Sequence, residues 1–360
     1  MYTYIRVHGL RFFQSHFLKE FIKIMTWIAI LTIGVGFLFA FINGMHDGSN
    51  VTATIIASRS FDAKKALALA CIAEFFGAIC LGTAVAKTVG VGVISQEEMM
   101  AADAEKGVTF ILAALLGGIL WNILTWILAL PSSSSHAVIG GLIGSGIMAF
   151  GWDAVLWESV LIKVILFMLL SPLIGFTIGL GVYLLFHWFF TGRKREVESV
   201  IVRLQRATMA VLAFAYGSND AQKSMGLIAM VVAMVYGKSE FDVDFWMMAG
   251  CAGALALGAI CGGFNMIKTI GMKIYKLEPA HSFSCQISTI FVLLTATILG
   301  APISTTQLIT ATVMGVGSGA NVRRVNWSII SKIIISWFTT IPAAGAIGAL
   351  VFWGLRALLA

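Results

Sequence analysis

Charged residues are scarce in this chain. Only 11% of its 360 residues are Asp, Glu, Lys or Arg, whereas a soluble domain carries about 25%. Hydrophobic residues make up 59%, and apolar stretches almost free of charge recur along the whole length. Because a bilayer-spanning helix needs about 20 such residues, we predict an all-α polytopic membrane protein with about ten to twelve membrane segments.

Motifs for several kinds of chemistry are also missing. The five cysteines form no Cys-x-x-Cys pair, which argues against a disulfide framework and against a zinc site. The chain has no Gly-x₄-Gly-Lys-Ser/Thr loop for ATP and no Gly-x-Ser-x-Gly elbow for a hydrolase. We attribute the net charge of +7 to cytoplasmic loops and not to a nucleic-acid partner. We therefore expect a multi-pass protein of the cytoplasmic membrane that is not an enzyme and holds no cofactor.

The second half of the chain repeats the first. Three blocks recur in the same order, and a chance match of three ordered blocks is improbable. The middle helix block carries the shared run Gly-Ala-Ile-Cys, and the first polar block aligns Asp47 with Asp220. The matched pairs are GMHDGSN (44–50) with GSNDAQK (217–223), FGAICLGTAVAKTVG (76–90) with LGAICGGFNMIKTIG (257–271), and PSSSSH (131–136) with PISTTQ (302–307).

Loop charges indicate how the two halves are oriented. In three pairs of corresponding loops the net charge reverses sign; the loop at 59–65, for example, is positive and its counterpart at 236–244 is negative. Under the positive-inside rule the halves then lie upside-down relative to each other. We predict two inverted-topology repeats with interrupted helices, broken near Gly44 and Gly217, and with re-entrant half-helices.

These patterns divide the chain into four segments. They are an interfacial or extra helix at 1–26, repeat 1 at 27–190, a basic cytoplasmic connector at 191–206, and repeat 2 at 207–360. The predicted helices span 27–58, 66–87, 108–130, 133–150, 156–190 with a kink at Pro172, 207–236, 245–267, 285–301, 302–318 and 327–356. The connector is a candidate contact for a cytosolic regulator or for anionic lipid, and a homo-oligomer is left open.

Asp47 and Asp220 lie in apolar surroundings, where a carboxylate costs roughly 2.5–3.5 kcal/mol even on lenient insertion scales. Such a group persists where it faces a cavity, a partner or an ion. Neighbouring glycines (Gly44, Gly48 and Gly217) would let the helix unwind and free backbone carbonyls for cations. The structural alternative is a carboxylate that holds two helices together. Its occurrence in both halves favours an ion or substrate site.

The hydroxyl runs predict a place for an anion. Pro131 and Pro302 suit the first turn of a helix, so the Ser and Thr residues that follow would lie at helix N-termini. Free backbone N–H groups and the positive end of the helix dipole favour an anion there. Two such tips from inverted halves would meet near the middle of the membrane and enclose a tetrahedral oxyanion. Simple helix capping is the alternative for either motif alone.

Charge balance requires cations beside such an anion. Two aspartates and a phosphate dianion cannot share a low-dielectric pocket without positive charge, and Lys223 supplies only one. Na⁺ or protons should therefore travel with the anion. His46, His136 and Glu74 are further titratable groups in apolar stretches, although a lone histidine is often only a hydrogen-bonded packing residue.

Together these motifs resemble the inorganic phosphate transporter family of secondary carriers, over residues 27–356. The family's first signature reads Gly-x-Asn-Asp-x-x-Asn; here His46 replaces the first Asn, and in the second signature Lys223 stands where the last Asn would be. The resemblance implies inverted repeats, phosphate held by the Ser/Thr motifs and Asp/Asn residues, and symport with Na⁺ or H⁺. The two departures leave the coupling ion open.

We therefore expect a cation-coupled phosphate symporter that works by alternating access. A carrier of sulfate or of metal-phosphate complexes is the alternative, and a passive anion channel is a third. The predicted substrate ligands are Asp47, Asn50, Ser133, Ser134, Ser135, Asn219, Asp220, Lys223, Ser304, Thr305 and Thr306. The candidate groups for the coupling cation are Asp47, Asn50, Asn219, Asp220, Glu74, His46, His136 and Gln307, with Asp47 and Asp220 as the Na⁺ ligands.

Overall fold

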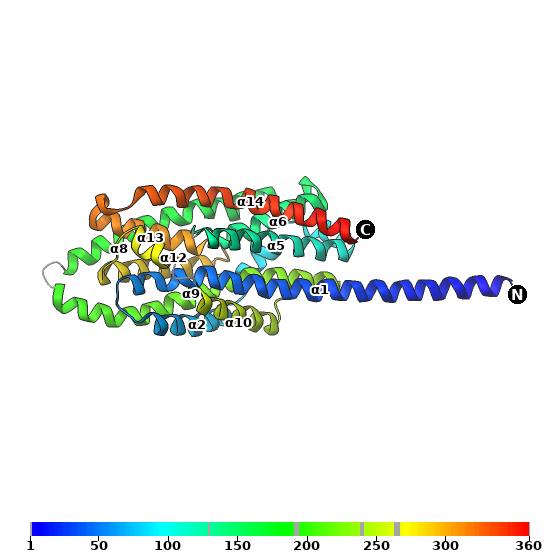
Figure 1. The fold of residues 1–360 in the computed structure, drawn as a ribbon, viewed down its shortest axis with the longest axis horizontal. Helices are drawn as coiled ribbons and strands as arrows, with labels where there is room; N and C mark the ends of the chain where they lie inside the picture. Colours follow the sequence, from blue (N-terminus) through cyan, green and yellow to red (C-terminus); the bar gives the residue numbers. More distant parts are fainter. Residues whose placement is uncertain (1, 129, 191–193, 238–240, 263–266, 360) are drawn as a thin grey trace.

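A computed structural model of the chain describes residues 2–128, 130–190, 194–237, 241–262 and 267–359. The described part is almost entirely helical, and most of the long helices run roughly along one axis of an elongated bundle (Figure 1). The helices are α1 (Tyr2–Ala57), α2 (Ala63–Cys80), α3 (Ala84–Val91), α4 (Gln96–Ala101), α5 (Ala104–Ile127), α6 (Ser134–Phe150), α7 (Trp157–Ser159), α8 (Phe167–Phe190), α9 (Lys194–Tyr236), α10 (Phe245–Cys261), α12 (Pro279–Ile298), α13 (Thr305–Asn321) and α14 (Trp327–Leu359).

Six of these helices are long and apolar enough to cross a bilayer, within the described residues. The pair α2–α3 would make a seventh, although it is bent by 73°. Two shorter apolar helices, α6 and α10, complete the apolar set. The sequence merges α2 and α3 into one helix at 66–87; that prediction is wrong, because the chain turns at 81–83, where Gly82 adopts a φ of 77° that favours glycine.

The predicted breaks at Gly44 and Gly217 are also wrong. Helices α1 and α9 continue through both positions, so no backbone carbonyls are freed there by unwinding. These glycines instead allow close helix approach. A Cβ atom on Gly44 would lie 2.0 Å from the backbone oxygen of Leu255 in α10, and one on Gly217 would lie 2.0 Å from that of Glu74 in α2. Here glycine provides contact between helices and not flexibility within one.

These two contacts correspond to each other. Glu74 and Leu255 stand two residues before the matched blocks that begin at 76 and 257, just as Gly44 corresponds to Gly217. Helix α1 thus packs on α10 as α9 packs on α2. The reciprocal glycines, Gly77 and Gly258, meet the backbone oxygens of Phe214 and Phe41 at the same distance, 1.9 Å from an added Cβ.

The last helix of each half packs on the other half. Helix α14 lies along α6, and α8 lies along α13 (Figure 1). Both seams use glycine: an added Cβ on Gly144 in α6 would lie 1.9 Å from Gly345 O, and one on Gly315 in α13 would lie 2.1 Å from Phe176 O. The two halves therefore pack against each other along both of these seams.

Four further boundaries differ from those predicted. The helix predicted at 207–236 begins at Lys194 as α9 and runs unbroken through residue 206, so residues 194–206 of the predicted connector are helical. Helix α1 is continuous from Tyr2 to Ala57, so the boundary at residue 26 falls within it, and its N-terminal part projects beyond the bundle (Figure 1). The predicted helix 245–267 ends at Cys261, and 263–266 lie outside the described residues. Helix α12 begins at Pro279, before the predicted start at 285, because Glu278 caps it.

The loops at the two ends of the bundle differ in charge. At one end the basic loop 59–65 contacts α9, where Arg206 lies 5.1 Å from the centre of the Phe61 ring. Towards the other end the acidic loops 95–105 and 151–158 are joined by a backbone hydrogen bond of 2.8 Å (Figure 1). The bundle thus carries its positive and negative loops at opposite ends.

The glycine seam between α1 and α10 gives a stability prediction. Gly44→Ala must push α10 away, and overpacking of this kind costs about 1–3 kcal/mol. Gly34→Ala is the matched control in the same helix, because a Cβ there meets nothing within 4 Å. We expect Gly44→Ala to lower the melting temperature in detergent and Gly34→Ala to keep or raise it. Equal melting temperatures would contradict the proposed seam.

Candidate functional site

The tips of α6 and α13 meet inside the bundle. The Ser135 hydroxyl at the start of α6 donates a 3.0 Å hydrogen bond to the backbone oxygen of Ile303, just before α13. The side chains of His136 and Gln307 lie 3.3 Å apart, Nδ1 to Nε2. These two residues end the matched motifs PSSSSH and PISTTQ, so corresponding positions of the two halves contact each other.

Both tips begin with a serine cap. Ser133 Oγ accepts a hydrogen bond from the backbone N of His136 at 3.2 Å, and Ser304 Oγ accepts one from Gln307 N at 3.3 Å. Each cap satisfies one of the free backbone N–H groups at its helix N-terminus. Two predicted substrate ligands, Ser133 and Ser304, therefore have hydroxyl oxygens that are already used as caps.

The carboxylate of Asp47, on α1, joins both tips. Ser134 Oγ of α6 donates to Oδ2 at 2.7 Å, and Thr306 Oγ1 of α13 donates to Oδ1 at 2.5 Å. Asn50 Nδ2, one turn further along α1, donates to Oδ1 at 2.8 Å and to Thr306 Oγ1 at 2.9 Å. Asp47 is 2% exposed, and a carboxylate this deeply buried requires several donors.

The carboxylate of Asp220, on α9, has a different environment. Lys223, one turn further along α9 and fully buried, forms an ion pair with Oδ1. Thr305 Oγ1 of α13 donates to Oδ2 at 3.2 Å. The Tyr216 hydroxyl donates to the backbone oxygen of Thr305 at 3.1 Å, which holds the tip of α13 against α9.

Of the predicted titratable groups, His46 lies beside Asp47, and Glu74 lies where α2 packs against α9. His46 Nδ1 is 3.6 Å from Asp47 Oδ1, and its Nε2 is 3.5 Å from Ser132 Oγ. Glu74 is buried on α2, where its backbone packs against Gly217, and its Oε2 has no hydrogen-bond partner among the described residues. Glu74 therefore places a third buried acid in the contact region of α2 and α9.

Several oxygen atoms of the site are left without a partner. Asn219 Nδ2 donates to Thr297 Oγ1 at 3.1 Å and to Ala301 O at 3.3 Å, whereas its amide oxygen has no partner among the described residues. Hard cations prefer oxygen ligands, and unpartnered buried carbonyl oxygens are available for one. In the described part of the chain these include Asn43 Oδ1, Asn50 Oδ1, Asn219 Oδ1 and Gln307 Oε1.

Sequence reasoning missed four polar residues near the site. Asn43 and Tyr216 stand immediately before Gly44 and Gly217, at corresponding positions one residue outside the quoted motifs. A search for polar residues at equal offsets in both halves would have found them. On α5, Asn122 and Thr125 carry no such signal, although the Thr125 hydroxyl lies 2.7 Å from that of Ser132.

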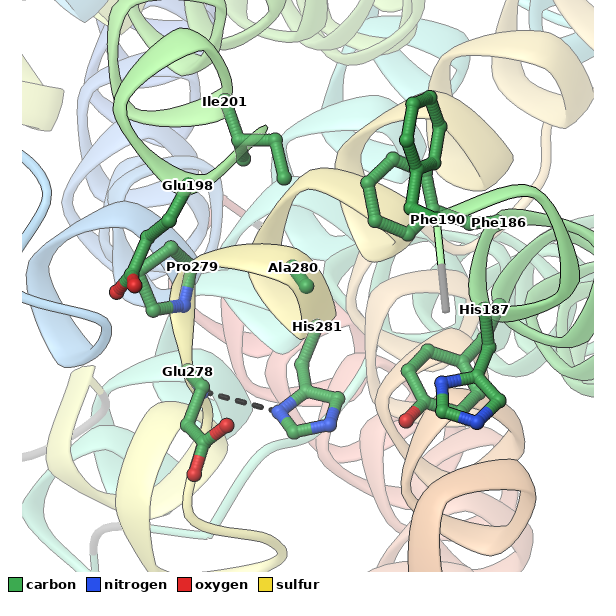
Figure 2. Close-up of a pocket in the computed structure, with 10 residues that line it drawn as sticks. Phe186, His187, Phe190, Glu198, Ile201, Glu278, Pro279, Ala280 and His281 are labelled. Atoms are coloured by element: carbon green, nitrogen blue, oxygen red, sulfur yellow. Dashed lines mark hydrogen bonds between the residues drawn. The ribbon is translucent and has the colours of Figure 1, made fainter. Parts of the chain in front are cut away.

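A cavity elsewhere does not belong to this site. It has a volume of about 190 Å³ and lies between the end of α8, the start of α9 and the start of α12. Figure 2 shows Phe186 and His187 on one side of it and His281 on the other, where His281 Nδ1 accepts a hydrogen bond from the backbone N of Glu278. None of the predicted site residues lines this cavity.

Comparisons with known proteins agree on one family. The model of the phosphate transporter family matches residues 43–348. A Rhizobium meliloti protein named "Probable low-affinity inorganic phosphate transporter" is 38% identical over 89% of this chain and 94% of its own, and a Bacillus subtilis protein of the same name is 35% identical over 92% and 98%. A solved structure, described as "The sodium-dependent phosphate transporter", shares the fold with a TM-score of 0.82 at 24% identity, over 92% of this chain and 99% of that one.

The bond between Thr306 and Asp47 links the two halves and can be tested. Thr306→Val keeps the shape and removes the hydroxyl, and a hydrogen bond to a charged group contributes about 1.5–3 kcal/mol. Thr295→Val is the control, because that exposed hydroxyl bonds only to Phe291 O of its own helix. We expect thermal unfolding in detergent to show a clear loss for Thr306→Val and little change for the control. Similar melting temperatures for the two variants would show that the hydrogen bond between Thr306 and Asp47 contributes little to stability.

Proposed function

The chain belongs to the phosphate transporter family, and from this membership and the geometry of the site we propose that it carries inorganic phosphate across the cytoplasmic membrane by cation-coupled symport. It is a multi-pass membrane protein and not an enzyme. One observation supports the proposal above the others: the hydroxyl-bearing tips of α6 and α13 meet beside the buried carboxylates of Asp47 and Asp220.

The tips supply what an oxyanion needs. Each is a helix N-terminus, with free backbone N–H groups and the positive end of a dipole. The hydroxyls of Ser134, Ser135, Thr305 and Thr306 add donors without adding charge. We assign these four residues to the phosphate oxygens, with Asn50, Asn219 and Lys223 around them, while Ser133 and Ser304 hold the tips in shape as caps.

The same hydroxyls supply a reason for coupling. Each has a single proton to donate, and those of Ser134, Thr305 and Thr306 now go to the carboxylates of Asp47 and Asp220. A phosphate oxygen can take these protons only when another positive group balances the carboxylate. A cation bound to the carboxylate supplies that charge and releases the hydroxyls. Cation and anion therefore stabilise each other's binding.

Na⁺ is the coupling cation that we favour. The fold neighbour is described as sodium-dependent, and the unpartnered oxygens of Asn43 and Asn50 lie on the same helix as Asp47. A proton carried by Glu74, His46 or His136 is the alternative. Gln307 and His136 contact each other where the tips of α6 and α13 meet. This pair is a further candidate for binding the coupling cation.

Alternating access would follow from two inverted repeats, at 27–190 and 207–360. The paired seams support this arrangement, because Gly44 meets α10 as Gly217 meets α2. The opposite charge of the two bundle ends supports a cytoplasmic location for the basic end, which includes the basic start of α9 at Lys194. Motion of one repeat against the other would then expose the site to each side in turn.

Uptake of labelled phosphate into proteoliposomes tests the function. We expect uptake to rise when an inward Na⁺ gradient is imposed and to fall without it, with a pH gradient imposed separately as the second arm. Excess sulfate is the control for substrate, and it should compete poorly with phosphate. Uptake that responds to neither gradient would reject symport, and strong competition by sulfate would favour the carrier of another oxyanion.

Asp47→Asn tests the role of the first carboxylate. Its donors are the neutral groups of Ser134, Asn50 and Thr306, so the variant should fold, while a cation loses the charge that holds it. We expect uptake to fall by about 100-fold, which corresponds to about 2.7 kcal/mol. Asp62→Asn is the matched control, because Asp62 is an exposed helix cap and Asn caps equally well. Normal uptake by a folded Asp47→Asn protein would return Asp47 to a structural role.

A further inference from the structure

The two carboxylates of the site differ in one neighbour. Asp47 and Asp220 are corresponding residues, and so are the residues one turn later, Asn50 and Lys223. Both of these neighbours donate to Oδ1 of their aspartate. In the first half the donor is a neutral amide, whereas in the second half it is an ammonium group with a full positive charge. The pocket is therefore matched in geometry and unequal in charge.

We propose that Lys223 is a built-in cation that takes the place of a transported one, so that the exchangeable coupling cation binds on the Asp47 side alone. This inference rests on the proposed function. It assigns the number of cations that accompany each phosphate, and it makes Lys223 the residue that sets this number. Lys223 remains attached to α9, so it neutralises Asp220 in every step of the cycle without leaving the protein.

The position of Lys223 supports this role. Its side chain is fully buried and lies one helical turn from Asp220, with which it forms an ion pair. A buried ammonium without a counter-ion is costly, so the pair should stay intact. A Na⁺ ion on Asp220 would share one carboxylate with this ammonium, and two positive charges so close repel each other strongly in a low-dielectric pocket.

The Asp47 side offers the opposite conditions. Its three hydrogen-bond donors are neutral hydroxyl and amide groups. The nearest titratable nitrogen in the described part of the chain, His46 Nδ1, stands 3.6 Å from Oδ1 and makes no hydrogen bond there. The amide oxygens of Asn43 and Asn50 on the same helix have no partner. This side therefore has a carboxylate whose hydrogen-bond donors are all neutral, together with carbonyl oxygens that could complete a cation site.

The test counts bound cations. Equilibrium binding of radioactive Na⁺ to the purified full-length chain, with saturating phosphate, should give one Na⁺ per chain for the wild type and none for Asp47→Asn. Lys223→Asn gives the second half the residue that the first half has at the corresponding position, Asn50. This variant should bind two Na⁺ ions per chain. In proteoliposomes the Hill slope of uptake against Na⁺ should rise from about one to about two in Lys223→Asn, with uptake at low Na⁺ reduced about tenfold or more and restored at high Na⁺.

Two matched variants complete the design. Lys223→Arg keeps the positive charge and should keep one Na⁺ and a slope near one. Asn50→Lys places a lysine beside Asp47, as Lys223 stands beside Asp220, and should abolish Na⁺ binding. An unchanged Na⁺ count and an unchanged slope in Lys223→Asn would overturn the proposal, because Lys223 would then act on the anion alone.

The outcome does not depend on one variant. If Lys223→Asn fails to fold, the proposal is still overturned by a wild-type chain that binds no Na⁺, or by one that keeps a bound Na⁺ after Asp47→Asn. Failure of the proposed function is distinguishable, because it would show as wild-type liposomes that take up no phosphate, whereas the binding count is made in detergent and needs no transport.

Discussion

A carboxylate buried in an apolar bundle is stable only where donors surround it, and Asp47 obtains its donors from three helices. This one constraint determines much of the architecture. It requires the tips of α6 and α13 to reach the middle of the bundle, and it requires α1 to pass between them. The bonds at Asp220 impose the same requirement on α9. The charged groups of the candidate site also position the helices.

Close helix approach makes this convergence possible. Where α1 crosses α10 and where α9 crosses α2, a glycine removes the side chain that would separate the backbones, as at Gly44 and Gly217. A glycine in a membrane helix can serve as a hinge or as a contact surface, and the sequence does not distinguish these roles. The neighbouring helix determines which role a glycine has. Here the neighbours are Leu255 and Glu74, which lie in segments far away in the chain.

The motifs located the polar residues that the structure brings together, since Asp47, Asp220 and the two hydroxyl runs are unusual in apolar surroundings. The lengths of most helices could also be predicted, because they follow from uninterrupted apolar runs. The break between α2 and α3 could not, because a helix can absorb a single Gly82. The hydrogen-bond partner of each hydroxyl could not be predicted either. Thr305 and Thr306 are adjacent in the sequence, yet Thr305 donates to Asp220 and Thr306 to Asp47.

The exchange of final helices between the halves has a consequence for biogenesis. Helix α6 has its glycine seam covered by α14, which is synthesised long after α6. Until residue 345 is synthesised, Gly144 lacks the backbone that it packs against, although Gly141 already meets α5. Insertion of the first half into the bilayer can therefore be complete before its packing is. A chain truncated before α14 would keep an uncovered face on α6, which quality-control proteases could recognise.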